Sequence, residues 1–421
     1  MSAVTGTRRS AASRLGLPEL RGHGRFVTGN LIDSVGNGML LPLGLLYFTD
    51  VQGLPPAHVG MAMTVGQAVA LPVTFLAGRL MDRLGPRPVV VAANIVSALG
   101  FTLFLFADRL WQVAAVHVLV QSGINMYFTA QRTLVLHVTE PGQERAWFAF
   151  TGSLRNIGLA AGAAAAAGAL TVFGKGALWW LIAVDAATYL LAALCFATLA
   201  TKPPEPAGTP PGRQATRTED TRRYLLLVAV NLPYVLAQAA LSVLVALYTT
   251  RALGLPASAA SLLFVVNTVL VSGCSTLVTA HLAPKAPRRA VAVGYLVMAA
   301  ATGAFMLPAL FSPSSSSSLA VTAWVALVAA ITLFSVAEIL LGPALSELSV
   351  TLTPDAAGGF TQGLYQFSWA VGMVAAPALF TLLLQAGPLL PWGAEAVACL
   401  IAMAAAPALK SANRHRRKDP R

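Results

Sequence analysis

Residues 77–91 read AGRLMDRLGPRPVVV, a short polar turn between two long apolar segments. The outline of this turn returns 202 residues later, where residues 279–293 read TAHLAPKAPRRAVAV, again between two apolar segments. A charged loop that recurs at half the chain length predicts an internal duplication.

Two further matches support the duplication. LYFTDVQGLP at 46–55 matches LYTTRALGLP at 247–256, and Asn30-Leu31 matches Asn231-Leu232. Both pairs are 201 residues apart, close to the spacing of the polar turns. Repeats that run in the same direction are related by an axis along the membrane normal, and substrate sites in such proteins lie between the halves near the midplane.

Composition places the chain in a membrane. Of 421 residues, 56% are hydrophobic and only 10% are charged, with a mean hydropathy of +0.70. A soluble globular protein carries roughly 25% charged residues. Apolar runs of 18 or more residues are typical of transmembrane helices, and we find twelve: 26–49, 57–80, 88–107, 110–132, 146–173, 177–200, 224–250, 257–282, 288–311, 319–345, 359–386 and 389–409. The sequence therefore predicts an all-α integral membrane protein with twelve transmembrane helices in two six-helix bundles.

The distribution of positive charge orients this arrangement. With twelve spans, 24 of the 28 Lys and Arg residues fall on the side that carries both termini. Cytoplasmic loops are enriched in Lys and Arg, so both termini are expected in the cytoplasm and the protein in the cell (inner) membrane. The net charge of +12 then favours contact with anionic lipid headgroups of the bilayer, and not with nucleic acid.

The chain divides into five regions, which are a basic cytoplasmic segment at 1–25, a first bundle at 26–201, a cytoplasmic linker at 202–223, a second bundle at 224–409 and a basic tail at 410–421. The linker is rich in Pro, Gly and charge. The basic, polar start argues against a cleavable signal. Three cysteines on separate spans predict neither a disulfide nor a metal site.

The turn at 77–91 resembles the loop 2–3 signature of the major facilitator superfamily, G-x-L-[AG]-D-[RK]-x-G-[RK]-[RK], at Gly78, Leu80, Asp82, Arg83, Gly85 and Arg87. The whole chain is similar to this family in its spans, halves and central linker. Residues 337–372 also resemble helices 10–11 of bacterial drug-efflux members. The resemblance implies a monomeric transporter that uses a proton gradient and needs no bound cofactor.

Two antiporter motifs are incomplete. Helix 4 keeps Gln121, but Val118 stands where drug/proton antiporters often have an arginine. Helix 5 keeps Gly158 and Gly162, but Ala163 replaces the expected proline. Proton antiport and export direction are therefore less well supported than membership of the family.

The resemblance implies a conformational latch at the repeated turn. In the family, the carboxylate at the position of Asp82 lies near the start of helix 11, where the helix dipole favours a negative charge. It also pairs with basic residues at the end of helix 4, for which Arg132 is the best match. The expected latch residues are Gly78, Asp82, Arg83, Gly85, Arg87 and Arg132. The alternative is that Asp82 and Arg83 only shape a charged turn.

Four charged residues lie within predicted helices, where a charge costs roughly 2.5–3.5 kcal/mol at the helix centre. Asp33 in helix 1 and Arg155 in helix 5 lie at similar depth. Asp33 is either a proton carrier that leaves Arg155 on protonation or half of a static pair, and we favour the carrier. Glu338 in helix 10 is the second proton-coupling candidate, or a carboxylate at the interface or at a helix cap. For Asp185 in helix 6 we expect a structural role.

Polar side chains also recur at helical spacing in helices 1, 4, 7, 10 and 11, which predicts a polar face on each. Helices 1, 4, 7 and 10 line the central cavity in the superfamily. The expected substrate-cavity residues are Asn37, His117, Gln121, Asn125, Tyr234, Gln238, Gln366 and Trp369. The alternative is hydrogen bonding between helices of one bundle, especially for Asn30 and Asn231, and simple packing for His117 and Trp369.

Three functions compete. The first is a secondary transporter that exports a small amphiphilic compound, such as a drug or natural product, by proton antiport, and so contributes to multidrug resistance. The second is an importer or facilitator of a small nutrient or metabolite. The third, a membrane-embedded enzyme, is disfavoured because the sequence has no P-loop, H-E-x-x-H or G-x-S-x-G motif.

Overall fold

The structure, a computed structural model, describes residues 15–40, 43–140, 142–199, 214–310, 317–353 and 358–409. These residues form helices and no strand. The first half contains α2 (Gly24–Leu40), α3 (Leu43–Leu46), η1 (Tyr47–Val51), α4 (Pro56–Val69), α5 (Val73–Leu84), α6 (Pro86–Phe104), α7 (Leu110–Val138), α8 (Glu144–Phe173), η2 (Gly174–Gly176) and α9 (Ala177–Ala197).

The second half contains α10 (Gln214–Ala239), η3 (Ala240–Leu244), α11 (Val245–Leu247), η4 (Tyr248–Ala252), α12 (Ala257–His281), α13 (Pro287–Leu310), α14 (Ser317–Thr351), α15 (Gly358–Ala386), α16 (Leu390–Ala405) and η5 (Ala406–Ala408). Ten segments of the described chain are long and apolar enough to cross a membrane. One of them, Glu144–Ala197, contains both α8 and α9, and α2 has only 17 residues. The chain is therefore an all-helical, multi-pass membrane protein.

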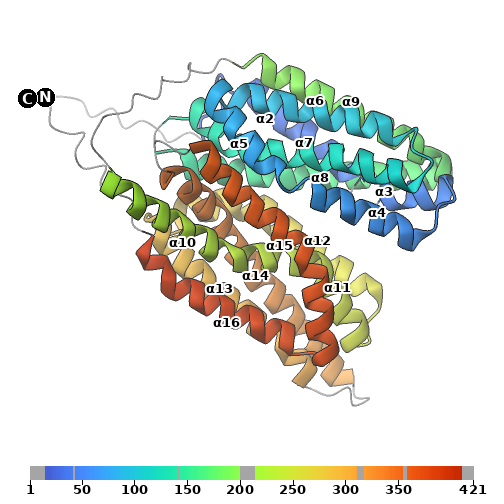
Figure 1. Cartoon of the computed structure of the whole chain (residues 1–421). Helices are drawn as coiled ribbons and strands as arrows, with labels where there is room; N and C mark the ends of the chain where they lie inside the picture. The colour runs from blue at the N-terminus through green and yellow to red at the C-terminus, as the bar shows by residue number, and fades with distance from the viewer. Residues whose placement is uncertain are drawn as a thin grey trace, which may run out of the picture.

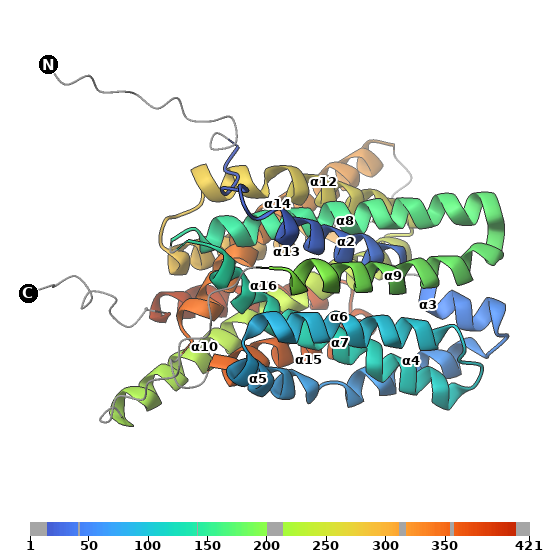
Figure 2. The same ribbon diagram turned by 90° about the horizontal axis from the view of Figure 1, so that it is seen from above.

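The helices gather by sequence order. Figure 1 shows α2 to α9 on one side of the molecule and α10 to α16 on the other, and Figure 2 shows the same elements from above. One cluster of buried apolar side chains lies wholly within the second half. Two others lie within the first half, except that Val350 of α14 joins one of them. The two halves meet where α8 packs against α12 and α14, and where α5 and α7 pack against α15.

The matched segments of the repeat adopt matched structures. η1 and η4 are both π-helical turns that begin at a tyrosine, and each is followed by a glycine with positive φ, Gly53 at 68° and Gly254 at 65°. Positive φ is a conformation that glycine adopts without steric cost. The Tyr47 hydroxyl donates to the carbonyl of Leu105 at 2.9 Å, and the Tyr248 hydroxyl donates to that of Phe305 at 2.6 Å. The matched segments at 46–55 and 247–256 thus share one backbone conformation.

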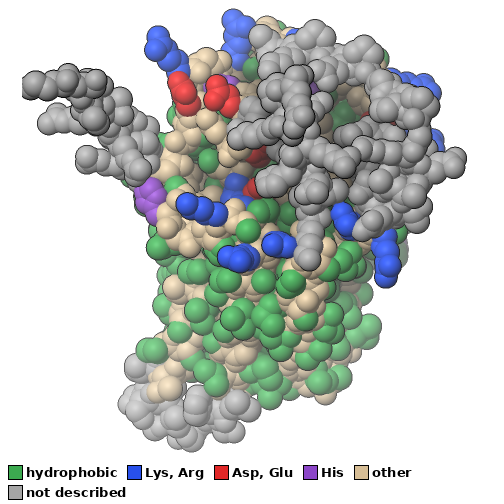
Figure 3. All heavy atoms as spheres, turned by 90° about the vertical axis from the view of Figure 1, so that its left-hand side faces the viewer, with side chains coloured by type: hydrophobic (Ala, Val, Ile, Leu, Met, Phe, Trp, Pro, Cys, Tyr) green, Lys and Arg blue, Asp and Glu red, His purple; other side chains and the backbone are tan. Residues whose placement is uncertain are grey.

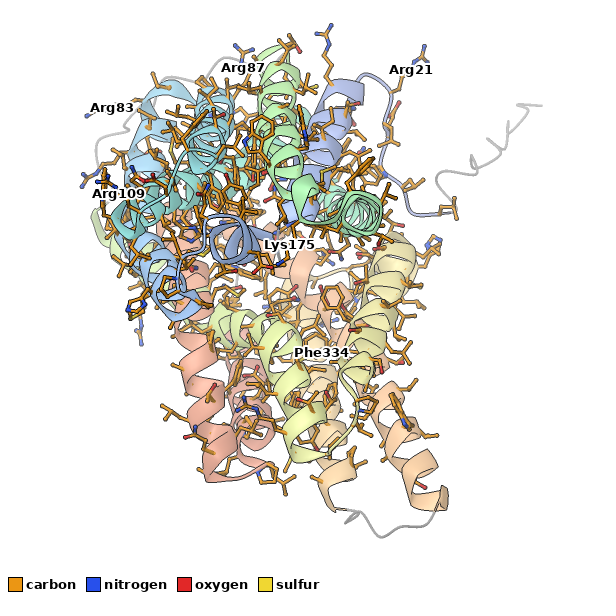
Figure 4. All side chains as sticks on the ribbon, turned by 90° about the vertical axis from the view of Figure 1, so that its right-hand side faces the viewer. Arg21, Arg83, Arg87, Arg109, Lys175 and Phe334 are labelled. Carbon is orange, nitrogen blue, oxygen red and sulfur yellow. The ribbon has the colours of Figure 1, made fainter. Side chains whose placement is uncertain are left out.

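Charge is concentrated at one end of the molecule. Lys and Arg side chains gather at the end where α10 begins, above a body of hydrophobic side chains (Figure 3). This end, which also holds Asp82 at the end of α5, is called the Asp82 end below. The opposite end, which faces the viewer in Figure 4, carries Arg109 and Lys175, and Phe334 lies among the helices of the second half. There the Lys175 Nζ lies 2.8 Å from an oxygen of Asp50.

The predicted linker is partly helical. α10 begins at Gln214, ten residues before the predicted start of the second bundle. Its first turns are polar, so hydropathy does not mark them, but they contain Arg, Gln and Glu, which favour a helix. Residues 1–14 of the predicted basic segment, 200–201 of the predicted first bundle, 202–213 of the predicted linker and the whole tail at 410–421 lie outside the described residues.

Candidate functional site

A small polar cavity lies within the first half, among α2, α6, α7 and α9. Its volume is about 10 Å³, which is enough for about one water molecule. Asp33 and Asn37, one turn apart on α2, lie on the same face of that helix. The other lining residues are Asn94, Ser97, Ile124, Tyr127, Phe128 and Tyr189. Tyr189 donates to the Asn37 side chain at 3.0 Å.

Arg155 of α8 connects this cavity electrostatically with the second half. Its guanidinium lies over the ring of Phe128, 4.5 Å from the centroid. Its charge acts on Asp33 of the first half and on Tyr234 of the second. No nitrogen of Arg155 lies within 4.0 Å of a carboxylate among the described residues. The arginine is exposed, whereas Asp33 is 6% exposed, so the two charges attract each other without forming a closed ion pair.

A second polar cluster lies in the other half. Asn267 of α12 donates to the Glu338 carboxylate of α14 at 3.0 Å, and to the Ser335 hydroxyl at 3.1 Å. The carboxylate therefore meets a side chain of another helix, and not a helix cap. Gln238 of α10 lies beside Glu338, and the rings of Tyr234 and Trp369 meet edge to face at 5.7 Å. Four of the predicted residues thus come together: Tyr234, Gln238, Glu338 and Trp369.

The polar face of α7 points elsewhere. Asn125 donates to the Ala70 carbonyl that follows α4 at 3.3 Å, and His117 packs against Gly66 of α4. Gln121 lies 3.4 Å from the His117 ring nitrogen. His117 and Asn125 thus face α4 and the residue that follows it, and none of the three residues lines the cavity beside Asp33.

The two repeat asparagines also make hydrogen bonds within their halves. Asn30 accepts from Tyr127 at 2.9 Å and from Gln131 at 3.1 Å. Asn231 accepts from Tyr365 at 2.8 Å. Both asparagines therefore join helices of one half, as the alternative reading of these positions proposed.

At the Asp82 end, α5 and α15 touch through their main chains. A Cβ on Gly78 would lie 2.0 Å from the Gly359 carbonyl oxygen, and a Cβ on Gly359 would lie 1.8 Å from that of Gly78. The Gly359 N–H donates to the Asp82 carboxylate at 2.6 Å. This places a negative charge at the start of α15, where unpaired N–H groups and the helix dipole favour it.

The basic residues of the predicted latch have other partners. Arg132 donates to Gln366 at 3.0 Å and to Gln362 at 3.4 Å, and its guanidinium lies over the Tyr365 ring. It therefore binds the side of α15, and not Asp82. Arg87 donates to the Leu199 carbonyl at 2.6 Å, which ties α6 to the end of α9. Gly85 ends α5 with a φ of 83°, and Arg83 is exposed.

A second contact between the halves involves Arg145, which entered the sequence analysis only as one of the positive charges that orient the protein in the membrane. Arg145, at the start of α8, lies 2.5 Å from a carboxylate oxygen of Glu347 at the end of α14. Its other nitrogen donates to the Pro284 carbonyl at 2.7 Å. Pro284 occupies the position of Asp82 in the second copy of the turn. No local pattern signals this contact, because its partners are far apart in the chain.

Sequence reasoning also passed over Glu395. This residue lies in the middle of α16, 3% exposed, and its nearest polar partner is the Cys399 thiol at 3.6 Å. Asp185 of α9 is fully buried. A single acid in an apolar run is itself the signal that could have found Glu395, because charge inside a span is costly.

Comparison with known proteins places the chain. The Major Facilitator Superfamily model matches residues 26–321. The uncharacterized MFS-type transporter YhjO of Bacillus subtilis is 27% identical over 209 residues, which cover 49% of this chain and 50% of that protein. The multidrug resistance protein MdtH of Sodalis glossinidius is 29% identical over 112 residues, 27% of this chain and 28% of that protein. The matched regions thus span half or less of these relatives.

The fold is similar to solved transporter structures. A bacterial homologue of the iron transporter ferroportin, in an outward-facing state, has a TM-score of 0.70 at 15% identity, with 92% of this chain and 99% of that chain covered. Because the family model covers well over half of the chain, this protein belongs to the Major Facilitator Superfamily of membrane transporters.

Proposed function

We propose that this protein exports a small amphiphilic organic compound, such as a drug or natural product, in exchange for protons. The observation that carries the proposal is that each half holds a buried or half-buried acid among polar or aromatic side chains, Asp33 in the cavity of the first half and Glu338 beside Asn267 and the Tyr234–Trp369 pair in the second. The likeness to MdtH, a multidrug resistance protein, over 112 residues supports efflux.

The proposal includes the membrane arrangement. Twelve spans form two six-helix halves of one monomer in the cell (inner) membrane, with α8 and α9 as separate spans and α2 and α3 as parts of one span. The positive charge at the Asp82 end makes that end cytoplasmic. Close main-chain contact at this end then corresponds to a transporter closed toward the cytoplasm, and separation of the halves there opens the inward-facing state.

Proton coupling follows from the electrostatics of Asp33. When Asp33 is ionised, its charge partly offsets that of Arg155. When a proton neutralises Asp33, the positive field of Arg155 extends fully into the space shared with Tyr234, which disfavours a cationic substrate and promotes its release. Glu338 provides a second acid in the other half, close to the aromatic pair that would hold the apolar part of the substrate.

The test uses an efflux-deficient bacterial host and a panel of toxic amphiphilic compounds. We expect the wild type to raise resistance to a subset of these compounds, and Asp33→Asn to abolish that resistance together with substrate-induced proton flux in everted vesicles. Glu395→Gln is the matched control, because it removes a buried acid remote from Arg155. Substrate uptake into cells along a proton gradient, with unchanged sensitivity to the whole panel, would contradict export.

A further inference from the structure

Asp185 of α9 is a fully buried acid whose carboxylate oxygens have no hydrogen-bond partner at regular geometry among the described residues. The Thr188 hydroxyl beside it donates instead to the main-chain carbonyl of Asp185 at 2.7 Å. A carboxylate without partners in such a place is costly when ionised.

The Asp185 carboxylate lies against α2. A Cβ built on Gly36 would lie 2.4 Å from the Asp185 Oδ1 and 2.0 Å from the Thr188 hydroxyl. Gly36 follows Asp33 by three residues, so both lie on the same side of α2. The absence of a side chain at Gly36 therefore allows the second acid to approach the first, and the charge of Asp33 acts on the Asp185 carboxyl group.

The cavity beside Asp33 contains a further unpartnered polar atom. Asn94 of α6 is 1% exposed and lines the cavity, and its side-chain oxygen has no hydrogen-bond partner among the described residues. The cavity has room for about one water molecule. A water molecule in this cavity would lie next to Asp33 and could donate a hydrogen bond to the Asn94 oxygen.

Other titratable groups act electrostatically on the pair from the neighbouring helices. Tyr127 faces it from α7, Arg155 from α8 and Tyr189 from α9. From α6 only the uncharged Asn94 and Ser97 line the cavity. Arg155 supplies one positive charge for two carboxylates, so ionisation of both leaves an uncompensated negative charge in the first half.

We propose that Asp33 and Asp185 hold one proton between them and titrate as a pair. Two acids close together in a medium of low dielectric cannot both ionise readily, so the first proton leaves easily and the second is retained. Asp185 is then a positioning residue, which retains the shared proton when Asp33 is ionised. The inference rests on the proposed proton-coupling role of Asp33.

The second half provides the contrast. Glu395 of α16 lies on the last helix of its half, as Asp185 does, but its only polar side-chain partner in the described structure is Cys399. No second acid is paired with it there, so Glu395 is expected to titrate as a single group.

The experiment follows protonated carboxyl groups by infrared spectroscopy as a function of pH, in the full-length protein in lipid nanodiscs. Wild type, Asp33→Asn, Asp185→Asn and Glu395→Gln are compared. We expect two separate steps for the pair in the wild type. Each of the two Asp variants should show one step, and the sum of these two midpoints should lie more than about one pH unit below the sum of the two wild-type midpoints. The reason is that an asparagine is neutral, so it does not raise the pKa of the remaining acid as an ionised partner does. Glu395→Gln should remove its own step and leave the pair unchanged.

If the two variants together reproduce both wild-type midpoints, one step each, the acids are independent and the inference is wrong. Should Asp185→Asn fail to fold, Asp185→Glu retains an acid at a different distance and must still move the step of Asp33. Gly36→Ala, which pushes the carboxylate away, should bring the two steps closer together. A protein that shows the paired titration but no proton-linked export overturns the proposed function and leaves this inference intact.

Discussion

The two copies of the polar turn join the halves by different means. In the first copy, Asp82 accepts the Gly359 N–H, and the main chains of α5 and α15 touch at Gly78. In the second copy, Pro284 offers only its carbonyl, which Arg145 of the other half binds while it also pairs with Glu347. Where the carboxylate has been lost, an arginine from the opposite half makes the contact.

This difference teaches that the repeat preserves the place of a contact and not its chemistry. The first contact depends on the absence of side chains at Gly78 and Gly359, and the charge of Asp82 adds to it. The second depends on a half-buried ion pair, whose side chains are 13% and 18% exposed. The two contacts should therefore respond differently to substitution. Separation of the halves at the Asp82 end can be measured with spin labels on the exposed residues Leu84 and Leu282, in a variant without native cysteines.

The largest effect is expected for Gly359→Ala. The new Cβ would collide with the Gly78 carbonyl, which cannot move without shifting α5, so the closed arrangement should be lost at a cost above about 3 kcal/mol. Pulsed electron paramagnetic resonance should show a longer distance between the labels, and transport should stop. Gly273→Ala on α12, where the Cβ meets open space, is the control. A closed distance distribution in Gly359→Ala would show that the glycine contact is dispensable.

Arg145→Ala should have the second largest effect. It removes two charge-assisted hydrogen bonds between the halves, worth about 1.5–3 kcal/mol together, or roughly a 10- to 150-fold shift toward the open state. Arg145→Lys should recover only part of this, because an ammonium cannot bind Glu347 and Pro284 in the same fork. The ratio of open to closed label distances measures both variants. If Arg145→Ala and the wild type had equal populations of the open and closed states, the second copy of the turn would serve only to orient the protein in the membrane.

Asp82→Asn should have a smaller effect than Arg145→Ala. The asparagine oxygen still accepts the Gly359 N–H, and only the interaction of the charge with the start of α15 is lost, about 0.3–1 kcal/mol. The label distances should therefore change slightly, and added salt should reduce the change. Asp82→Ala, which also removes the acceptor, should shift the distances further. A larger shift for Asp82→Asn than for Arg145→Ala would reverse the comparison.

The smallest effect is expected at the opposite end, where Asp50 pairs with Lys175. The hydrogen bond from Lys175 lowers the pKa of Asp50 below its usual range. A lowered pKa means that the pair adds stability above the usual carboxyl pKa and loses it as the pH falls through the lowered value. Asp50→Asn should thus reduce the thermal unfolding midpoint slightly at neutral pH and not at strongly acidic pH. A difference that persists in acid would assign the effect to packing.

The repeat explains why this last pair has no copy. Arg251 occupies the position of Asp50 in the second half, so the charge there is reversed. An Asp50→Arg variant therefore reproduces the second-half residue, and we expect it to repel Lys175 and lower the unfolding midpoint more than Asp50→Asn does.

Much of the fold could be predicted, because it depends on local pattern. The predicted span at 359–386 and the helix Gly358–Ala386 differ by one residue at the start. The match of LYFTDVQGLP with LYTTRALGLP predicted a repeat, and both segments contain a π-helical turn, which the sequence did not predict. The start of α10 was missed because its first turns are polar, and hydropathy identifies only the apolar part of a helix.

The partners within the site were harder to predict, because they depend on packing across the chain. Arg132 was matched with Asp82 by resemblance, yet three groups of α15, Gln362, Tyr365 and Gln366, surround its guanidinium. Arg145 and Glu347 are 202 residues apart and carry no shared pattern. The asparagine and glutamine positions of α7 were correctly placed on one face, but periodicity does not say whether that face meets another helix or a cavity.

The main-chain contact between Gly78 and Gly359 has a mechanical consequence. α15 has 29 residues and is therefore roughly 43 Å long, and Gly359 lies at its very tip. If the halves pivot near the far end of this helix, a rotation of only about 5° moves the tip by roughly 4 Å, more than the width of a water molecule. A contact at the end of so long a lever converts a slight tilt into a full opening, so the protein needs very little deformation of its cores to change state.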